Sequence, residues 1–320
     1  MAIIEAEGLR KSFKARRVVV EAVQGIDMRV ETGEIFGFLG PNGAGKTTTL
    51  RMLTTLLQPS GGKAIVVDHD LLREPARIRE RIGYVSQVGG VDRSATGREE
   101  LLLQARIYGL SKAQAHTRAA ELLSMFELKS FADRVASTYS GGQRRRLDLA
   151  LGMVNRPKLL FLDEPTAGLD PQSRAQLWDE VRKLRDAGTT IFLTTHYLEE
   201  ADVLCDRLVI IDHGQIVAEG TPDSLKRRVV GDVVILGVDA HDNLLQRAQD
   251  LLGSQPFVRE CQAREDKLRL YVERGEEALP SILHLLDGAA IRISTIELAR
   301  PSLDDVFLRQ TGRSLRDSVN

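Results

Sequence analysis

Cysteine is scarce in this sequence. Only Cys205 and Cys261 occur among 320 residues, and neither has a partner at metal-ligand spacing. Disulfide-stapled domains and cysteine zinc sites need several cysteines close together, so both classes are excluded. We expect two reduced thiols in a cytosolic protein.

Long apolar runs are also missing. Nowhere do eighteen apolar residues run together, so we do not expect the chain to span a membrane. Any work at a membrane would need another polypeptide to do the spanning. The N-terminal stretch MAIIEAEGLRKSF has acidic residues inside its apolar part and no small-residue cleavage site, which is not the pattern of a signal peptide.

An excess of charge of either sign is absent. The 44 basic and 45 acidic side chains give a formal net charge of −1, so no overall basic field indicates bulk nucleic-acid binding. The hydrophobic fraction of 42% and the charged fraction of 28% are typical of a soluble globular protein. A length of 320 residues favours two domains over one.

Glycine, in contrast, is concentrated in one loop. The stretch GFLGPNGAGKTTTLRM follows an apolar run that predicts a buried strand and leads into a run that predicts a helix. Its centre fits the pattern G-x-x-x-x-G-K-[ST]. The matching residues are Gly40, Pro41, Asn42, Gly43, Ala44, Gly45, Lys46 and Thr47. A chance match in a chain of this length has a probability on the order of one in a hundred.

This loop predicts a nucleotide site. Its glycines let successive backbone N–H groups turn inward around phosphate oxygens, and the following helix N-terminus adds partial positive charge. We expect Lys46 to reach the β- and γ-phosphates and Thr47 to hold Mg²⁺. Thr48 is the candidate to contact the α-phosphate.

A second buried strand ends in two acids. The stretch KLLFLDEPTAGLD begins with a continuous apolar run, typical of a strand covered on both faces of a parallel sheet, and then reaches Asp163 and Glu164. Buried charges need partners, and Mg²⁺-ATP supplies one. We expect Asp163 to support Mg²⁺ and Glu164 to polarise the attacking water. The alternative is a pair of solvated acids at the start of a loop.

Two further strand ends carry polar side chains. Gln87 follows a predicted strand over Ile82–Val85, and a neutral amide there can touch Mg²⁺ or water without adding charge. His196 ends the run TTIFLTTH, where an imidazole could hydrogen-bond the γ-phosphate and orient the attacking water. Taken singly, a surface glutamine and a histidine satisfied by local backbone are the simpler interpretations.

A second glycine-bearing turn opens another predicted helix. In ASTYSGGQRRRLDLALGMV the turn consists of Ser140, Gly141, Gly142 and Gln143. It offers a hydroxyl and free N–H groups at a helix N-terminus, an anion site without a lysine. Such a turn can complete a triphosphate site but cannot hold one alone, which suggests a site assembled from two parts. The arginine run 144–146 favours a solvated, salt-bridged face over nucleic-acid contact.

Together these motifs resemble the ATP-binding subunit of ABC transporters. GPNGAGKTT, Gln87, YSGGQRRRL, LLFLDEP, AGLD and TTH occur in the order and spacing of that family, over roughly residues 3 to 225. The resemblance implies a P-loop NTPase fold that uses ATP and Mg²⁺. It also implies a head-to-tail homodimer in which residues 140–143 face the P-loop of a second copy.

The same resemblance assigns further roles. Asp170 would link the two ATP sites, Gln87 would sense the membrane partner, and His196 would act as the γ-phosphate switch. Phe13 stands where the family stacks an aromatic ring on adenine, most often a tyrosine. The implied partner is a separate transmembrane permease, which would hold the chain at the cytoplasmic face of the cell membrane. No nucleic acid is expected.

The sequence also predicts a division of the chain. We expect an ATP-binding α/β domain with a mostly parallel sheet over 1–225, including a helical subdomain at about 88–150 in which Met125 and Phe126 belong to the core. Residues 230–312 read as a ferredoxin-like βαββαβ unit, followed by a helix N-capped by Ser302. This tail resembles that of daunorubicin-resistance-type drug-exporter ATPases, which implies export of a hydrophobic drug or antibiotic-like compound.

Two other classes of function are considered. The alternative is a soluble ABC-type ATPase that acts on DNA or ribosomes. Against it, no long heptad arms separate the P-loop from the Asp-Glu pair, and only one cassette occurs in the chain. A nucleotide-gated binding module that does not hydrolyse ATP would lack Glu164, which is present.

Overall fold

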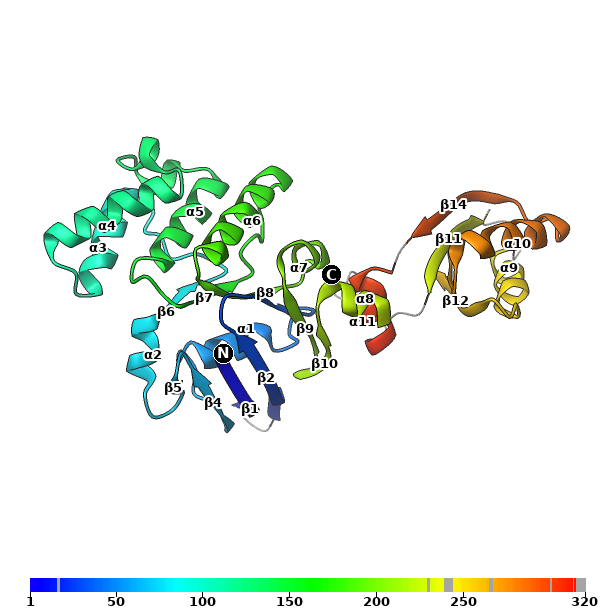
Figure 1. Cartoon of the computed structure of the whole chain (residues 1–320), viewed down its shortest axis with the longest axis horizontal. Helices are drawn as coiled ribbons and strands as arrows, with labels where there is room; N and C mark the ends of the chain where they lie inside the picture. Colours follow the sequence, from blue (N-terminus) through cyan, green and yellow to red (C-terminus); the bar gives the residue numbers. More distant parts are fainter. Residues whose placement is uncertain are drawn as a thin grey trace. The chain divides into compact units, whose positions relative to one another are not determined.

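The computed structural model describes residues 1–15, 18–228, 231–238, 244–264, 267–299, 301–312 and 314. These residues form two compact units, Met1–Pro222 and Asp223–Ser314, which are coloured blue to green and yellow to red in Figure 1. The sequence places the domain border a few residues later, between 225 and 230.

A six-stranded sheet forms the centre of the first unit. Its order is β10-β9-β3-β8-β7-β6, and all neighbours are parallel except β9 and β10. The strands are β3 (Ile35–Leu39), β6 (Ile82–Val85), β7 (Leu159–Asp163), β8 (Thr190–Thr195), β9 (Arg207–Asp212) and β10 (Gln215–Gly220). β3, β7 and β8 are buried at every residue, which explains why no lysine, arginine or glutamate occurs in them and why their polar residues lie at or near the strand ends. The predicted parallel α/β architecture is confirmed.

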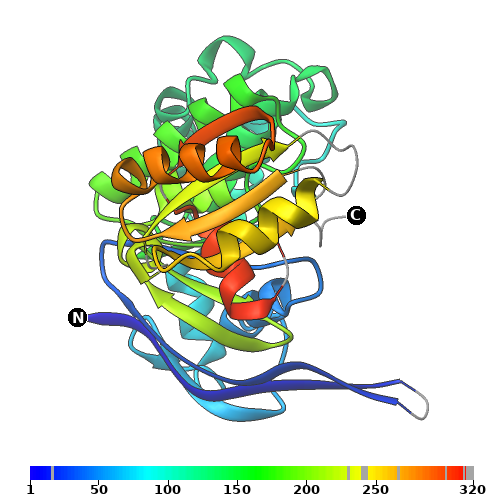
Figure 2. The same ribbon diagram turned by 90° about the vertical axis from the view of Figure 1, so that its right-hand side faces the viewer.

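A second sheet is antiparallel, in the order β2-β1-β4-β5. Its strands are β1 (Ala2–Ala15), β2 (Val18–Glu31), β4 (Gly61–Val66) and β5 (His69–Asp70). β1 and β2 run side by side as the dark blue pair in Figure 2. Helix α1 (Lys46–Leu53) contacts strands of both sheets. The core between them includes Phe192, whose ring centroid lies 5.4–5.7 Å from those of Phe36, Phe38 and Phe161.

Three helices gather at one end of this unit (Figure 1). They are α3 (Gly97–Ile107), α4 (Lys112–Met125) and α5 (Gly141–Gly152), and each begins with a capping box. Buried residues of α4 repeat at helical spacing through Leu122 and Leu123 and continue to Phe126. Met125 falls off that stripe and is 47% exposed, so its prediction as a core residue is wrong. The other helices of the unit are α2 (Pro75–Arg81), α6 (Pro171–Asp186) and α7 (Leu198–Leu204).

The second unit contains an antiparallel sheet in the order β12-β13-β11-β14 with its own apolar core. Its strands are β11 (Asp232–Val238), β12 (Val258–Arg264), β13 (Lys267–Val272) and β14 (Ile293–Ala299). Its helices are α9 (Leu244–Gly253), α10 (Gly275–Gly288) and α11 (Leu303–Thr311), with α8 (Pro222–Arg228) at the border. The element order is the predicted βαββαβ, and Ser302 caps α11 as predicted.

Candidate active site

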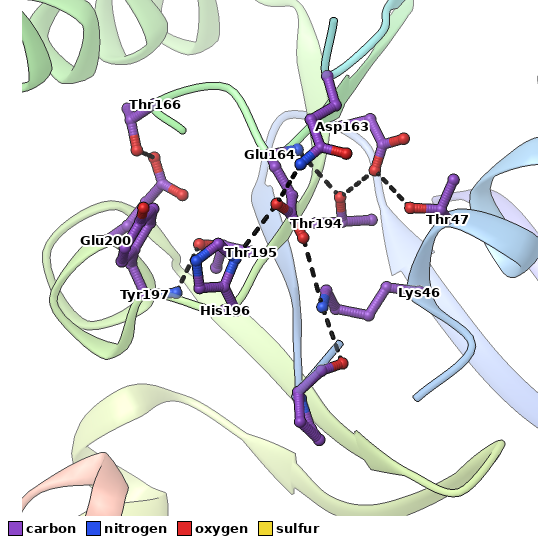
Figure 3. A network of polar contacts seen from close by, with 12 residues as sticks. Lys46, Thr47, Asp163, Glu164, Thr166, Thr194, Thr195, His196, Tyr197 and Glu200 are labelled. Atoms are coloured by element: carbon purple, nitrogen blue, oxygen red, sulfur yellow. Dashed lines mark hydrogen bonds and ion pairs between the residues drawn. The ribbon is translucent and has the colours of Figure 1, made fainter. Parts of the chain in front are cut away.

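The predicted site residues follow four strands that end at one edge of the parallel sheet. The P-loop follows β3, Gln87 follows β6, the acidic pair ends β7, and His196 follows β8. Carboxyl ends of parallel strands meet at the same edge, where ligands bind in open α/β sheets. Figure 3 shows how closely the side chains from these segments approach one another.

The P-loop encloses its space with backbone. Gly45 has φ 105° and a Cβ there would lie 2.5 Å from the carbonyl oxygen of Ala22, so both the handedness and the close approach require glycine. The loop borders a pocket of about 370 Å³. Its described lining residues are Ala22, Asn42, Gly43, Gly45, Lys46, Thr47, Thr48, Gln87 and Glu164.

Lys46 is buried inside this loop. Its Nζ donates to the carbonyl oxygens of Gly40 (2.8 Å) and Pro41 (3.0 Å) and lies 3.5 Å from Oε1 of Glu164. Burial lowers the pKa of Lys46, and the neighbouring carboxylate of Glu164 opposes that shift. The loop therefore holds one cation at its centre, facing an acid.

Asp163 lies between two threonines. Its Oδ1 accepts hydrogen bonds from the hydroxyls of Thr47 (3.0 Å) and Thr194 (2.6 Å), while Oδ2 accepts none from the described residues. A hydroxyl and a carboxylate side by side are the hard oxygen ligands that Mg²⁺ prefers. Thr47 and Asp163 therefore fit the predicted metal site. Gln87 lines the same pocket, with its amide Nε2 donating to Oε2 of Glu164 (2.8 Å), and its role at the metal stays a prediction.

Glu164 is the centre of the polar network. Its Oε2 accepts from Nε2 of Gln87 (2.8 Å) and lies 3.2 Å from Nδ1 of His196. Burial raises the pKa of this carboxyl, but the contact with His196 and the charge of Lys46 outweigh burial and hold the pKa of Glu164 below its ordinary value of 4.5. Glu164 is therefore ionised at neutral pH.

The backbone of Glu164 is unusual. Its φ of 46° lies in the left-handed region, which is rare for residues other than glycine. Its N–H donates to both the carbonyl oxygen and the hydroxyl of Thr194, each at 3.1 Å. Strained backbone of this kind persists where the surroundings hold it, and it clusters at functional sites.

His196, which follows β8, lies next to Glu164. Its Nδ1 is buried and close to Glu164, yet no described residue forms an aligned hydrogen bond with it. Its ring centroid lies 4.0 Å from that of Tyr197, whose N–H donates to Oγ1 of Thr195.

The turn 140–143 and Asp170 form a separate group. The hydroxyl of Ser140 accepts from N of Gln143 (3.2 Å) as the cap of α5. Asp170 caps α6 by accepting from N (2.9 Å) and Oγ (2.7 Å) of Ser173. A Cβ on Gly142 would lie only 2.9 Å from Oγ of Ser173, so the two caps pack together. None of the residues 140–143 is among the described residues that line the pocket.

Phe13 also lies outside the described pocket lining. Its side chain is exposed, and Nζ of Lys11 lies 5.3 Å from the centre of its ring. The exposed ring of Phe13 on β1 is free to stack on an adenine base, and that role remains a prediction.

Sequence reasoning missed three polar residues around the site. Thr194 pairs with Asp163 in the parallel register of β7 and β8, and that register is the signal that could have found it. Glu200 is fully buried on α7, four residues after His196, and it accepts from Oγ1 of Thr166 (2.8 Å) and Nε1 of Trp178 (3.2 Å). Burial raises the pKa of Glu200. Figure 3 shows Glu200 beside Thr166.

The third missed residue is Arg145. The sequence predicts a solvated face for the arginine run, but Arg145 is only 6% exposed, so that prediction is wrong for this residue. The position of Arg145 around the helix axis is the signal that could have predicted its burial. Arg145 shares a face with the buried residues Asp148, Leu149 and Gly152 at spacings of three, four and seven residues.

Comparisons with known proteins identify the family. Residues 23–167 match the family model described as ABC transporter, and residues 220–311 match the C-terminal domain of DrrA1-3-like ATP-binding proteins. The chain is 45% identical to the daunorubicin/doxorubicin resistance ATP-binding protein DrrA of Streptomyces peucetius, over 98% of this chain and 94% of the relative. The chain belongs to the ABC transporter ATP-binding proteins.

Further comparisons agree. This ABC ATP-binding protein is 34% identical to the linearmycin resistance ATP-binding protein LnrL of Bacillus subtilis (strain 168), over 98% of this chain and all (100%) of the relative. The solved dimer of the ATP-binding cassette MJ0796 in a post-hydrolysis state, bound to ADP and Pi, is 25% identical with a TM-score of 0.63. That comparison covers 68% of this chain and 98% of the cassette.

Membership in the family carries an activity. As an ABC ATPase this chain binds and hydrolyses ATP, and ABC ATP-binding proteins dimerise and act with separate membrane permease subunits. Across the described ranges of the chain, no helix has both the length and the apolar character needed to cross a bilayer.

Proposed function

We propose that this chain is the Mg²⁺-dependent ATPase of an exporter for hydrophobic drugs or antibiotic-like compounds. It would work as a homodimer at the cytoplasmic face of the cell membrane, bound to a separate transmembrane permease. The observation that carries the proposal is similarity through both units to DrrA, a protein named for daunorubicin/doxorubicin resistance. LnrL is named for resistance to another compound, linearmycin, so we propose a class of substrate and not a single one.

The proposed chemistry uses the residues at the sheet edge. Lys46 would exchange its carbonyl partners for the β- and γ-phosphate oxygens of ATP. Thr47 and Asp163 would hold Mg²⁺, which neutralises phosphate charge when bound. Glu164, ionised at neutral pH, would accept a hydrogen bond and then a proton from the attacking water. His196 and Gln87 would orient that water and the γ-phosphate beside Glu164.

The proposed dimer follows from the separation of the two groups of residues. The turn at Ser140 has anion-binding character but packs against the Asp170 cap instead of lining the pocket of its own chain. A second copy arranged head to tail would bring this turn to the phosphates. Each ATP would then be bound by the P-loop of one copy and by residues 140–143 of the other.

An efflux assay tests the export function. The chain would be expressed in a drug-sensitive bacterium together with a candidate membrane protein chosen from the neighbouring reading frames, and cell-associated doxorubicin would be measured after extraction. We expect lower accumulation with wild type than with Lys46→Ala or with the membrane protein alone. Equal accumulation in all three strains, with both proteins present in the membrane fraction, would contradict drug export.

The dimer is tested by a matched pair of serine variants. Ser140 and Ser111 both cap helices through Ser-x-x-Gln boxes in the same unit. Each serine-to-alanine change should cost about 1 kcal/mol of stability through loss of the cap. Only Ser140→Ala should also reduce ATP-dependent dimerisation and turnover, because only Ser140 is proposed to meet the partner's nucleotide.

The measurements are thermal unfolding, size-exclusion chromatography with ATP, and phosphate release. Equal activity of Ser140→Ala and Ser111→Ala would remove Ser140 from the ATP site.

A further inference from the structure

Arg145 lies in the interior of the first unit, on the face of α5 that points toward the sheet. Its guanidinium Nε donates to the carbonyl oxygen of Pro165 (2.6 Å) and Nη1 to that of Ser86 (2.7 Å). Nη2 makes longer contacts with the carbonyl oxygens of Asp163 (3.3 Å) and Glu164 (3.4 Å). One planar group thus connects the segments that follow two neighbouring strands, β6 and β7.

These two segments carry the groups that meet in the active site. The Ser86 segment presents Gln87, and the Pro165 segment presents Glu164. The Gln87 amide and the Glu164 carboxylate are 2.8 Å apart. Arg145 therefore fixes the backbone on both sides of a contact that it does not itself make.

Asp148 holds the other end of the Gln87 loop. It lies one turn after Arg145 on α5, with Oδ2 3.8 Å from Nη1 of Arg145, and its Oδ1 accepts from N of Gly90 (2.9 Å). The loop is closed on itself, because N of Gly89 donates to the carbonyl oxygen of Ser86 (3.1 Å) and Oγ of Ser86 donates to that of Gly89 (2.9 Å). α5 thus contacts the loop on both sides of Gln87.

Burying the charged side chains of Arg145 and Asp148 costs desolvation free energy. That cost suggests that the pair serves to fix the position of the backbone segments around it. Both side chains are almost fully buried, Arg145 at 6% and Asp148 at 7% exposure. A buried ion pair is weak support for stability, since apolar residues of similar volume often do as well or better. A guanidinium offers five donors in a fixed plane, and that rigidity suits it to hold several carbonyls in register.

We infer that Arg145, supported by Asp148, is a positioning residue for ATP hydrolysis, holding the Gln87 loop and the Glu164 segment in register. The inference rests on the proposed role of Glu164. Among the described residues that line the phosphate pocket, Arg145 hydrogen-bonds only to Glu164, and there to the backbone carbonyl oxygen and not to the carboxylate. Its loss should therefore reduce kcat and leave ATP affinity nearly unchanged.

The first test is Arg145→Lys, with Arg146→Lys as its control on the same helix. A lysine keeps the charge but cannot span four carbonyls. We expect kcat to fall about 10- to 100-fold, the scale of a displacement of about 1 Å in an active site. Arg146 lies outside this network, with Nη1 3.5 Å from both the carbonyl oxygen of Phe126 and Oε2 of Glu127, so its replacement should leave kcat unchanged.

A second pair of variants tests the positioning of the Gln87 loop if Arg145→Lys fails to fold. Gly89 has φ +77°, and a Cβ there would lie 2.8 Å from Oδ2 of Asp148, so Gly89→Ala displaces the loop without emptying the core. Gly109 has a similar φ of +82° with nothing within 4 Å of a Cβ, so Gly109→Ala carries the same backbone strain away from the site. We expect a lower kcat for Gly89→Ala only.

The readouts are phosphate release, equilibrium binding of ATP, and hydrogen exchange of the amides at residues 86–91. In Arg145→Lys and Gly89→Ala these amides should exchange faster while P-loop amides do not. Wild-type kcat in Gly89→Ala and in any folded Arg145→Lys protein would overturn the inference, as would a loss of ATP affinity equal to the loss of kcat. If Glu164→Gln keeps wild-type turnover, the role of Glu164 fails, whatever the Arg145 variants show.

Discussion

Replacing Lys46 with alanine is expected to weaken ATP binding by a factor on the order of 10²–10⁴. Lys46 is the only cation among the described residues that line the phosphate pocket. A charge-assisted hydrogen bond contributes roughly 1.5–3 kcal/mol, and an ammonium between the β- and γ-phosphates can make two. Equilibrium titration of the purified variant with ATP measures the effect.

A surface lysine supplies the control for Lys46→Ala. Lys63 is exposed on β4 and pairs with Glu7 at 2.8 Å, so Lys63→Ala removes the same charge from the protein without touching the pocket. Its ATP affinity should equal that of wild type. If Lys46→Ala also binds ATP normally, the assignment of the P-loop as the phosphate site is wrong.

The variant Glu164→Gln is expected to bind ATP and lose about 10²–10⁴-fold in turnover, the usual contribution of a positioned base. Glutamine keeps the shape of the side chain but cannot take a proton from water. It also removes a negative charge 3.5 Å from Lys46 that would face the γ-phosphate, so ATP binding should persist. Phosphate release and ATP titration measure the two effects separately.

The same variant tests the assembly. Because hydrolysis would reset the dimer, Glu164→Gln should accumulate as an ATP-bound dimer on size-exclusion chromatography. Glu180→Gln is the control, since Glu180 is equally buried and lies 3.0 Å from Nζ of Lys183. A Glu164→Gln protein that stays monomeric at every ATP concentration would contradict the site shared between two copies. Wild-type turnover would assign the base to another residue, with His196 the nearest candidate.

The groups around the pocket could be predicted because their signals are local. The P-loop is defined by the spacing of its glycines and lysine. The buried strands are predicted by apolar runs that end at Asp163 or His196. The rule that parallel strands end at one edge then brings these residues together without knowledge of the strand order. The capping boxes at Ser140 and Ser302 are likewise readable within four residues.

The missed residues depend on contacts between distant segments. Thr194 lies 31 residues after Asp163 in the sequence, and the two become partners only because β7 pairs with β8. Arg145 looks like one of three surface arginines until the segments after β6 and β7 supply carbonyls for it. The exposure of Met125 could not be predicted for a related reason, because the face of α4 that is buried depends on what packs against it.

The indole of Trp178 gives this protein a built-in optical reporter. It is the only tryptophan in the chain, and it donates from a buried position on α6 to Glu200 on α7. α6 begins at the Asp170 cap and α7 begins two residues after His196, so intrinsic emission comes from a single point between the two segments. Any rearrangement that separates α7 from α6 would expose the indole to water and shift its emission to the red, with no label attached.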